Sequence, residues 1–116
     1  MINERHTKRV ADLLDDKSIE VVTGGQVDVS QRYIAPTIVR CRDNAKVMKD
    51  EIFGPVLPVL TVPSLQGAID FVRYSQLSSC ITGFVPPQVN KREKPLALYV
   101  FAEDGKAQQQ ALSLTS

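Results

Sequence analysis

Residues 54–72, GPVLPVLTVPSLQGAIDFV, decide the fold class of this 116-residue chain. The first half, GPVLPVLTV, is almost continuously apolar, which is typical of a strand with both faces covered in an α/β protein. In the second half, Ser64 can cap a helix whose apolar residues recur at i, i+3, i+4 and i+7 from Leu65 to Val72. A buried strand followed directly by an amphipathic helix predicts an α/β fold.

The residues before this pair predict a helix and several β-segments. Asn3 can cap a helix that runs to about Asp15, with Val10, Leu13 and Leu14 on its apolar face and His6 on the same side. The β-segments are SIEVVT at 18–23 and RYIAPTIVRC at 32–41, and Pro36 argues for an edge or a bend in the second of them and against a central ladder. DNAKVMKDE, at 43–51, has the pattern of a short helix with Asp43 or Asn44 as its cap.

The residues after the pair predict a second buried strand and a last helix. LALYVFA, at 96–102, has the composition of a buried strand, and Asp104 can cap the helix that follows it. A β–α–β–α order implies a right-handed crossover and a parallel pair of strands. The expected architecture is therefore α/β, a partial parallel sheet with flanking helices.

Composition excludes several classes of function. The formal charge of +1 creates no strong field toward nucleic acid or acidic lipid. His6 lies far from Cys41 and Cys80 in the sequence and there is no CxxC, so no metal site is expected. MINERHTKRV is not a signal peptide, and no stretch approaches the ~20 apolar residues of a membrane span. These features predict a cytoplasmic globular protein with no membrane segment in this chain.

Five ordered blocks together resemble the NAD(P)-dependent aldehyde dehydrogenases, in particular the class 3, fatty-aldehyde type. The blocks are INERHTKRVADLL (2–14), RYIAPTIV (32–39), VMKDEIFGPVLPVL (47–60), AIDFV (68–72) and NKREKPLALYVF (90–101). The resemblance spans nearly the whole chain. It implies a parent enzyme that oxidises an aldehyde substrate to a carboxylic acid with NAD or NADP, and a parent that forms a homodimer.

The resemblance also implies two cofactor-binding residues. In that family the Glu of E-I-F-G-P accepts hydrogen bonds from the nicotinamide ribose, and the Phe packs near the nicotinamide ring; these roles fall on Glu51 and Phe53. An ionised carboxylate is acceptor-only, so it can hold two adjacent hydroxyl groups. The alternative is that Glu51 is a solvated acid at a helix end and Phe53 fills the core.

The family's catalytic residues do not match any position of this chain. Its cysteine nucleophile, which forms a thiohemiacetal, and its general-base Glu lie N-terminal to the region matched here. Neither Cys41 nor Cys80 stands in the expected sequence context or beside a histidine that could lower its pKa. Residues 1–116 are therefore expected to be a C-terminal part of the catalytic domain, inactive alone. A non-catalytic α/β interaction module that binds or regulates a full-length subunit is the alternative.

Residues 73–89 interrupt the resemblance. Class 3 members would continue from AIDFV directly into NKREKPLALYVF, so these residues are expected to be an insertion, either a loop or a retained intron. A loop of this size costs little closure entropy, since doubling a loop adds only about 0.6 kcal/mol. The inserted residues could bulge outward or prolong the preceding helix.

Overall fold

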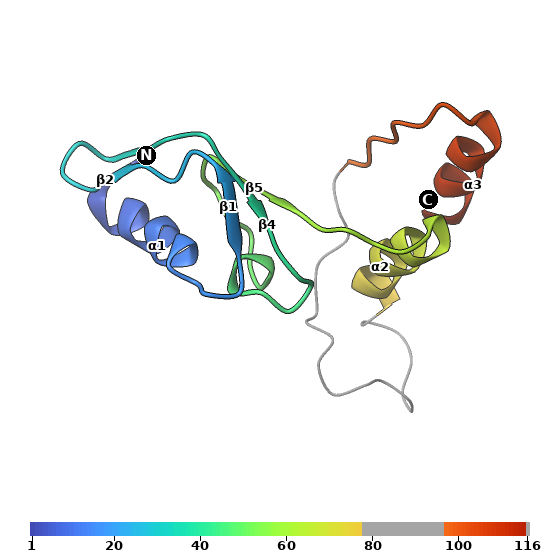
Figure 1. The fold of residues 1–116 in the computed structure, drawn as a ribbon, viewed down its shortest axis with the longest axis horizontal. Helices are drawn as coiled ribbons and strands as arrows, with labels where there is room; N and C mark the ends of the chain where they lie inside the picture. The colour runs from blue at the N-terminus through green and yellow to red at the C-terminus, as the bar shows by residue number, and fades with distance from the viewer. Residues whose placement is uncertain (78–96, 116) are drawn as a thin grey trace. The chain divides into compact units, whose positions relative to one another are not determined.

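The computed structural model describes residues 1–77 and 97–115. The chain divides into two compact units, Met1–Thr61 and Val62–Ser116 (Figure 1). The first unit contains both sheets, and the second, where described, is helical. The mixed α/β class predicted from the sequence is confirmed.

The first unit is built on a three-stranded sheet with the order β1-β4-β5. Its strands are β1 (Glu20–Thr23), β4 (Thr37–Arg40) and β5 (Val56–Val59). The β1–β4 pair is antiparallel, whereas β4 and β5 are parallel with Val39 opposite Pro58. A separate antiparallel pair joins β2 (Val27–Asp28) to β3 (Tyr33–Ile34). The run is interrupted at Pro36, because β3 ends before it and β4 starts after it. β4 itself is the central strand of the three-stranded sheet, so the expectation of an edge there is wrong.

Helix α1 (Glu4–Leu14) lies alongside these strands and supplies the centre of the core (Figure 1). Its predicted cap is confirmed: the side-chain oxygen of Asn3 accepts a hydrogen bond of 2.8 Å from the His6 backbone N–H. Val10 has no exposed surface and packs in a cluster with Val39 and Val56 of the sheet. Full burial of such a side chain stabilises a fold by about 1.5–3 kcal/mol.

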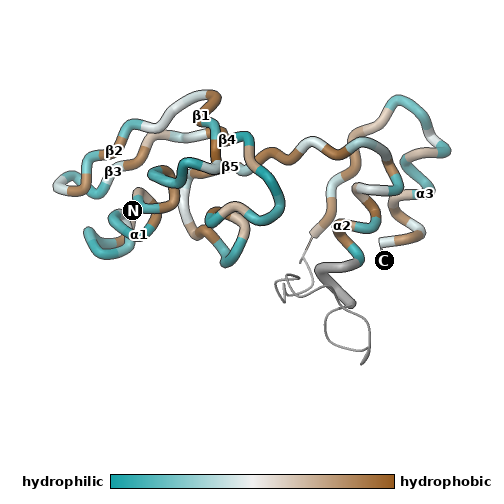
Figure 2. The backbone as a smooth tube through the Cα atoms, turned by 60° about the horizontal axis from the view of Figure 1, so that its bottom comes forward, coloured by the Kyte–Doolittle hydropathy of each residue, from teal (hydrophilic) through white to brown (hydrophobic). Residues whose placement is uncertain are grey.

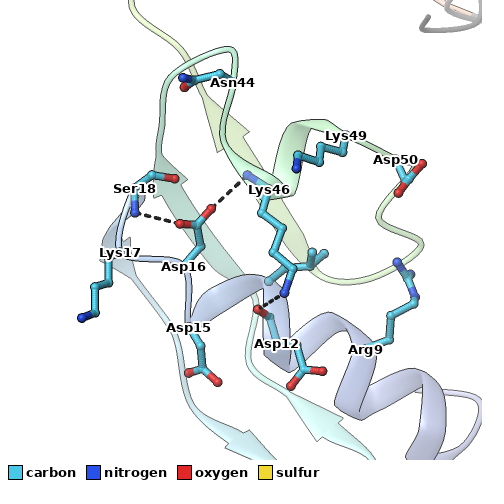
Figure 3. Close-up of a pocket in the computed structure, with 11 residues that line it drawn as sticks. Arg9, Asp12, Asp15, Asp16, Lys17, Ser18, Asn44, Lys46, Lys49 and Asp50 are labelled. Atoms are coloured by element: carbon cyan, nitrogen blue, oxygen red, sulfur yellow. Dashed lines mark hydrogen bonds between the residues drawn. The ribbon is translucent and has the colours of Figure 1, made fainter. Parts of the chain in front are cut away.

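The short helix predicted within 43–51 is a single 3₁₀ turn, η1 (Lys46–Met48), and its predicted cap is wrong. Ala45 occupies the cap position, and neither Asp43 nor Asn44 fills that role. The Lys46 backbone N–H instead donates to a carboxylate oxygen of Asp16 at 2.9 Å (Figure 3). A carboxylate from a distant segment thus satisfies a backbone donor that lacks a partner within η1.

The prediction that both faces of the strand in 54–62 are covered is also wrong. Val56 is buried, but Leu57 is 59% exposed and Val59 is exposed as well. β5 is one of the two edge strands of the three-stranded sheet. Proline is tolerated at an edge, because the backbone N–H that Pro58 lacks would have no partner strand on the outer side. Figure 2 shows the apolar run continuing past β5.

The second unit begins with helix α2 (Leu65–Leu77), whose predicted cap is confirmed. The Gly67 backbone N–H donates to the Ser64 hydroxyl at 3.1 Å. The helix continues past Val72 and so includes the first residues of the expected insertion, while 78–89 lie outside the described residues. Helix α3 (Gly105–Thr115) packs on α2, and Asp104 caps it as predicted by accepting from the Lys106 N–H at 2.9 Å.

The strand predicted at 96–102 is not formed over its described residues. Residues 97–102 have no regular secondary structure, and Phe101 is 94% exposed. A strand requires a partner for its backbone N–H and C=O groups, and the described part of the second unit holds only helices. The parallel pair is therefore β4–β5, connected through η1, and not the pair predicted across α2.

Candidate functional site

The candidate site is the segment Glu51 to Gly54, which links η1 to β5. The Ile52 side chain is half-buried against the core of the first unit. The side chains on either side of it, Glu51 and Phe53, are both exposed, and Phe53 is 69% exposed. Phe53 does not fill the core of the first unit. The two predicted cofactor-binding residues thus flank an anchored isoleucine and project from the same short segment.

Phe53 has an unusual backbone conformation. Its φ is +47°, in the left-handed region. For a residue with a Cβ this region costs about 1–2 kcal/mol, so it persists only where the surroundings impose it. The adjoining residues must therefore hold the segment in place.

Helix α1 supplies the groups that hold it. His6 Nε2 lies 2.7 Å from the carbonyl oxygen of Phe53. Arg9 donates through Nη2 to the carbonyl oxygen of Ile52 and, at 3.4 Å, through Nε to His6 Nδ1. The sequence placed His6 on the inner side of the helix but did not reveal this role. The available signal was the spacing of His6, Arg9 and Val10, which lie at i, i+3 and i+4 on one helix face.

Gly54 allows α1 to approach this closely. A Cβ at position 54 would lie 3.0 and 3.2 Å from the two methyl groups of Val10, and 3.4 Å from Met1 Cε. A side chain here would therefore require the segment or the fully buried Val10 to shift by a few tenths of an ångström. The glycine is required here by packing, since its φ is not among the positive values.

Glu51 presents a carboxylate whose acceptor positions are unused by the rest of the described chain. No group within residues 1–77 and 97–115 forms a hydrogen bond or ion pair with its side chain. An exposed ionised carboxylate of this kind can accept hydrogen bonds from two vicinal hydroxyl groups. An exposed aromatic ring two residues away can cover the flat face of a ring bound there.

A hollow beside the C-terminal end of α1 adjoins this segment through Arg9 and Asp50, although no residue of the segment lines it (Figure 3). Its lining includes Asp12, Asp16 and Lys46. Hydrogen bonds from the backbone N–H of Ser18, and next from that of Lys46, lower the pKa of Asp16 below its ordinary value. The Lys46 ammonium also donates to the Asp12 carbonyl oxygen at 3.1 Å. These contacts fasten η1 to the end of α1. We therefore interpret the hollow as the structural junction of these two elements.

Neither cysteine is placed as a nucleophile by the described residues. Cys41 is buried in the core cluster at the end of β4, and Cys80 lies outside the described residues. Across the described ranges, no three His, Cys, Asp or Glu side chains gather as metal ligands, and no helix is long and apolar enough to cross a bilayer.

Comparison with known proteins identifies the family to which the chain belongs. Residues 1–81 match the model of the aldehyde dehydrogenase family. The chain belongs to the aldehyde dehydrogenase family. The residues matched include the whole first unit, with the Glu51–Gly54 segment and the helix that holds it. The resemblance of the ordered sequence blocks to this family is confirmed.

The similar proteins include class 3 members of the aldehyde dehydrogenase family. "Aldehyde dehydrogenase family 3 member A2" from Rattus norvegicus is 41% identical over 100% of this chain, which covers 20% of that protein. The "Aldehyde dehydrogenase, dimeric NADP-preferring" of the same organism is 43% identical, again over 100% of this chain and 22% of the relative. This aldehyde dehydrogenase chain thus spans about a fifth of the length of the curated relatives that it matches.

A solved structure supports the same assignment. The Staphylococcus aureus enzyme AldH, in its substrate-bound state, matches all of this chain with a TM-score of 0.79 and 35% identity. This chain covers 22% of that structure. The fold described above is therefore that of part of an aldehyde dehydrogenase catalytic domain.

Proposed function

We propose that Glu51 and Phe53 contact the nicotinamide half of NAD or NADP in an enzyme that oxidises an aldehyde to a carboxylic acid. The observation that carries this proposal is the exposed pair on a backbone held by α1. Both side chains project from one segment whose carbonyl groups are fixed by His6 and Arg9. When bound, the dinucleotide would serve as the hydride acceptor.

The chemistry of the two side chains fits this cofactor. The Glu51 carboxylate would accept hydrogen bonds from the two ribose hydroxyl groups, and charge-assisted bonds of this type are shorter and stronger than neutral ones. The Phe53 ring would pack beside the nicotinamide and limit its orientation. Because orientation of the reacting groups can account for several kcal/mol of a barrier, both residues should affect hydride transfer as well as affinity. The name of the NADP-preferring rat relative supports a nicotinamide dinucleotide as the class.

The rest of the enzyme would come from outside residues 1–116. We propose that this chain forms a C-terminal part of the catalytic domain and that 73–89 are an insertion. The cysteine nucleophile and general base would lie on the missing part, so the chain alone should not turn over aldehyde. The parent enzyme is proposed to be a cytoplasmic homodimer.

A second candidate function is a non-catalytic module that binds a full-length dehydrogenase subunit. An independent module should bury its apolar faces, so the uncovered apolar surface of the sheet at Ile38, Leu57 and Val59 favours a piece of a larger domain over this second candidate. Uncovered apolar surface of this kind marks a face that another chain or domain covers. Sedimentation of the 116-residue chain, alone and with a purified class 3 subunit, distinguishes the two. A stoichiometric complex favours the module.

The test of the proposed function is to isolate the native gene product and to assay it. Mass spectrometry should detect peptides upstream of Met1, and the same preparation should form NADH or NADPH only when an aldehyde is supplied. A native product of 116 residues without this activity would contradict the enzymatic proposal.

A further inference from the structure

Two residues of α1 contact the backbone of the Glu51–Gly54 segment although they lie more than 40 positions before it. We propose that His6 and Arg9 are positioning residues, which set the geometry of the cofactor-contact segment without touching the cofactor. The inference rests on the proposed function. It adds a hydrogen-bond relay, from Arg9 through His6 to Phe53, as the device that fixes the segment.

The direction of the relay follows from its donors. The guanidinium of Arg9 can only donate, so its Nε–H, 3.4 Å from His6 Nδ1, requires Nδ1 to be the acceptor. In the neutral imidazole the proton then resides on Nε2. The Nε2–H of His6 donates to the Phe53 carbonyl oxygen at 2.7 Å. Arg9 thereby selects the tautomer that His6 needs for its contact with the segment.

The relay acts at the place where the segment is strained. The carbonyl groups of Ile52 and Phe53 flank the left-handed φ of +47° at Phe53, and each accepts a hydrogen bond from α1. Two fixed carbonyl groups define the orientation of successive peptide planes. Without them, Phe53 should relax toward a negative φ, which would redirect its ring and move Glu51. A displacement of about 1 Å in a positioned group can lower a rate by roughly a hundredfold.

The anchoring of α1 does not depend on the relay. Val10 and Thr7 are both fully buried, and Asn3 caps the helix, so the helix remains attached when His6 changes. His6 is only half-buried and Arg9 is exposed. Substitution at these two positions should therefore leave the fold of the first unit intact, which separates a positioning role from a merely structural one.

The kinetic test uses the longest natural product that carries these residues. His6→Leu removes the donor to Phe53, whereas His6→Gln retains an N–H that can reach the same carbonyl group. Lys8→Ala, an exposed change on the same helix, is the control. We expect His6→Leu to raise the KM for NAD(P) by up to about tenfold with little change in the KM for aldehyde, since ordering of the segment worth ~1.4 kcal/mol, a factor of ten, must then be supplied when the cofactor binds. His6→Gln should recover most of the loss.

The outcomes separate this inference from the proposed function. If the unsubstituted protein oxidises aldehyde but His6→Leu leaves the KM for NAD(P) unchanged, or changes both KM values equally, the relay does not position the cofactor segment. If the unsubstituted protein does not oxidise aldehyde with NAD(P), the proposed function fails, and the positioning role fails with it.

A spectroscopic test of the relay needs no cofactor. His6 is the single histidine of the chain, so its two ring nitrogens can be assigned directly in long-range ¹⁵N spectra of the 116-residue chain. We expect one neutral tautomer with the proton on Nε2, and a shift of the Nδ1 signal in Arg9→Ala but not in Lys8→Ala. A mixture of tautomers that Arg9→Ala does not alter would show that Arg9 does not direct His6.

Discussion

The imidazole of His6 lies 2.7 Å from the carbonyl oxygen of Phe53, across 47 positions of sequence. This contact joins the first helix to the segment that precedes β5. It explains how an exposed phenylalanine can keep a left-handed backbone conformation. The segment belongs to the part of the chain that matches the aldehyde dehydrogenase family, and under the proposed function its geometry would set the contacts with the cofactor.

Close packing of the segment on α1 predicts the effect of Gly54→Ala. The new methyl group would meet the methyl groups of Val10 at 3.0 and 3.2 Å. Overpacking of this kind costs about 1–3 kcal/mol, and we expect a loss of that size in the free energy of unfolding measured with urea. Gly67→Ala in α2 is the control, because its Cβ would lie 3.5 Å from the nearest atom. Equal effects of the two substitutions would contradict the packing role of Gly54.

Backbone crowding predicts a larger effect for Gly24→Ala. Gly24 has a φ of +82°, and a Cβ there would lie 2.3 Å from the Pro36 carbonyl oxygen and 2.8 Å from the Thr37 Cα. These are backbone atoms of the neighbouring segment, and they cannot change rotamer to relieve the contact as a side chain can. The left-handed conformation adds about 1–2 kcal/mol, so the total loss should exceed roughly 2 kcal/mol.

Gly25→Ala is the matched control for Gly24→Ala. Its φ is +88°, but the nearest atom to a Cβ is the Val21 Cγ1, at 3.2 Å. This side chain can move, so the cost should be close to the conformational term alone. If thermal melts of the two variants coincide, contact with Pro36 does not determine the requirement for glycine at position 24.

Asp16 predicts a dependence of stability on pH. Its pKa in the folded chain is lowered from 3.8 by hydrogen bonds from the Ser18 and then the Lys46 backbone N–H. A lowered pKa stabilises the fold at pH values above 3.8, and this contribution is lost as pH falls through the lower folded pKa. Asp16→Asn should therefore lower the melting temperature at pH 7 and reduce the difference between pH 7 and pH 2.

Part of the acid dependence should survive in Asp16→Asn. Hydrogen bonds from the Ser30 hydroxyl and then the Gln31 N–H lower the pKa of Asp28 in the same direction. Asp15→Asn is the control, since this exposed neighbour lies on the same turn. Calorimetry at a series of pH values gives the melting temperatures of the unsubstituted chain, Asp16→Asn and Asp15→Asn. An unchanged pH profile for Asp16→Asn would exclude the proposed junction between η1 and α1.

The sequence predicted the elements that depend on local signals. Asn3, Ser64 and Asp104 cap the helices that they were expected to cap, because a capping side chain bonds to backbone groups two or three residues away. Pro36 interrupts the β-run between β3 and β4 for an equally local reason. The family resemblance located Glu51 and Phe53 on one segment, and their roles as cofactor contacts stay predictions.

The features that the sequence did not reveal depend on distant partners. The strand predicted near Phe101 has no strand beside it in the described part of the second unit, so its apolar composition alone gave a wrong prediction. Whether the face that carries Leu57 is covered depends on what packs against β5, and the residues of the strand do not determine this. Asp16 replaces the predicted cap of η1 across 30 positions, and His6 reaches Phe53 from another element. Contacts of such long range leave no periodic pattern.

The most direct test of the central claim is the kinetic comparison of Glu51→Gln with Asp50→Asn in the longest natural product. Both changes remove one exposed carboxylate from adjacent positions. Hydrogen bonds to a charged group contribute about 1.5–3 kcal/mol, so we expect Glu51→Gln to lower kcat/KM for NAD(P) by roughly ten- to a hundredfold while Asp50→Asn leaves it unchanged. Equal kcat/KM values for the two variants and the unsubstituted protein would contradict a cofactor contact at Glu51.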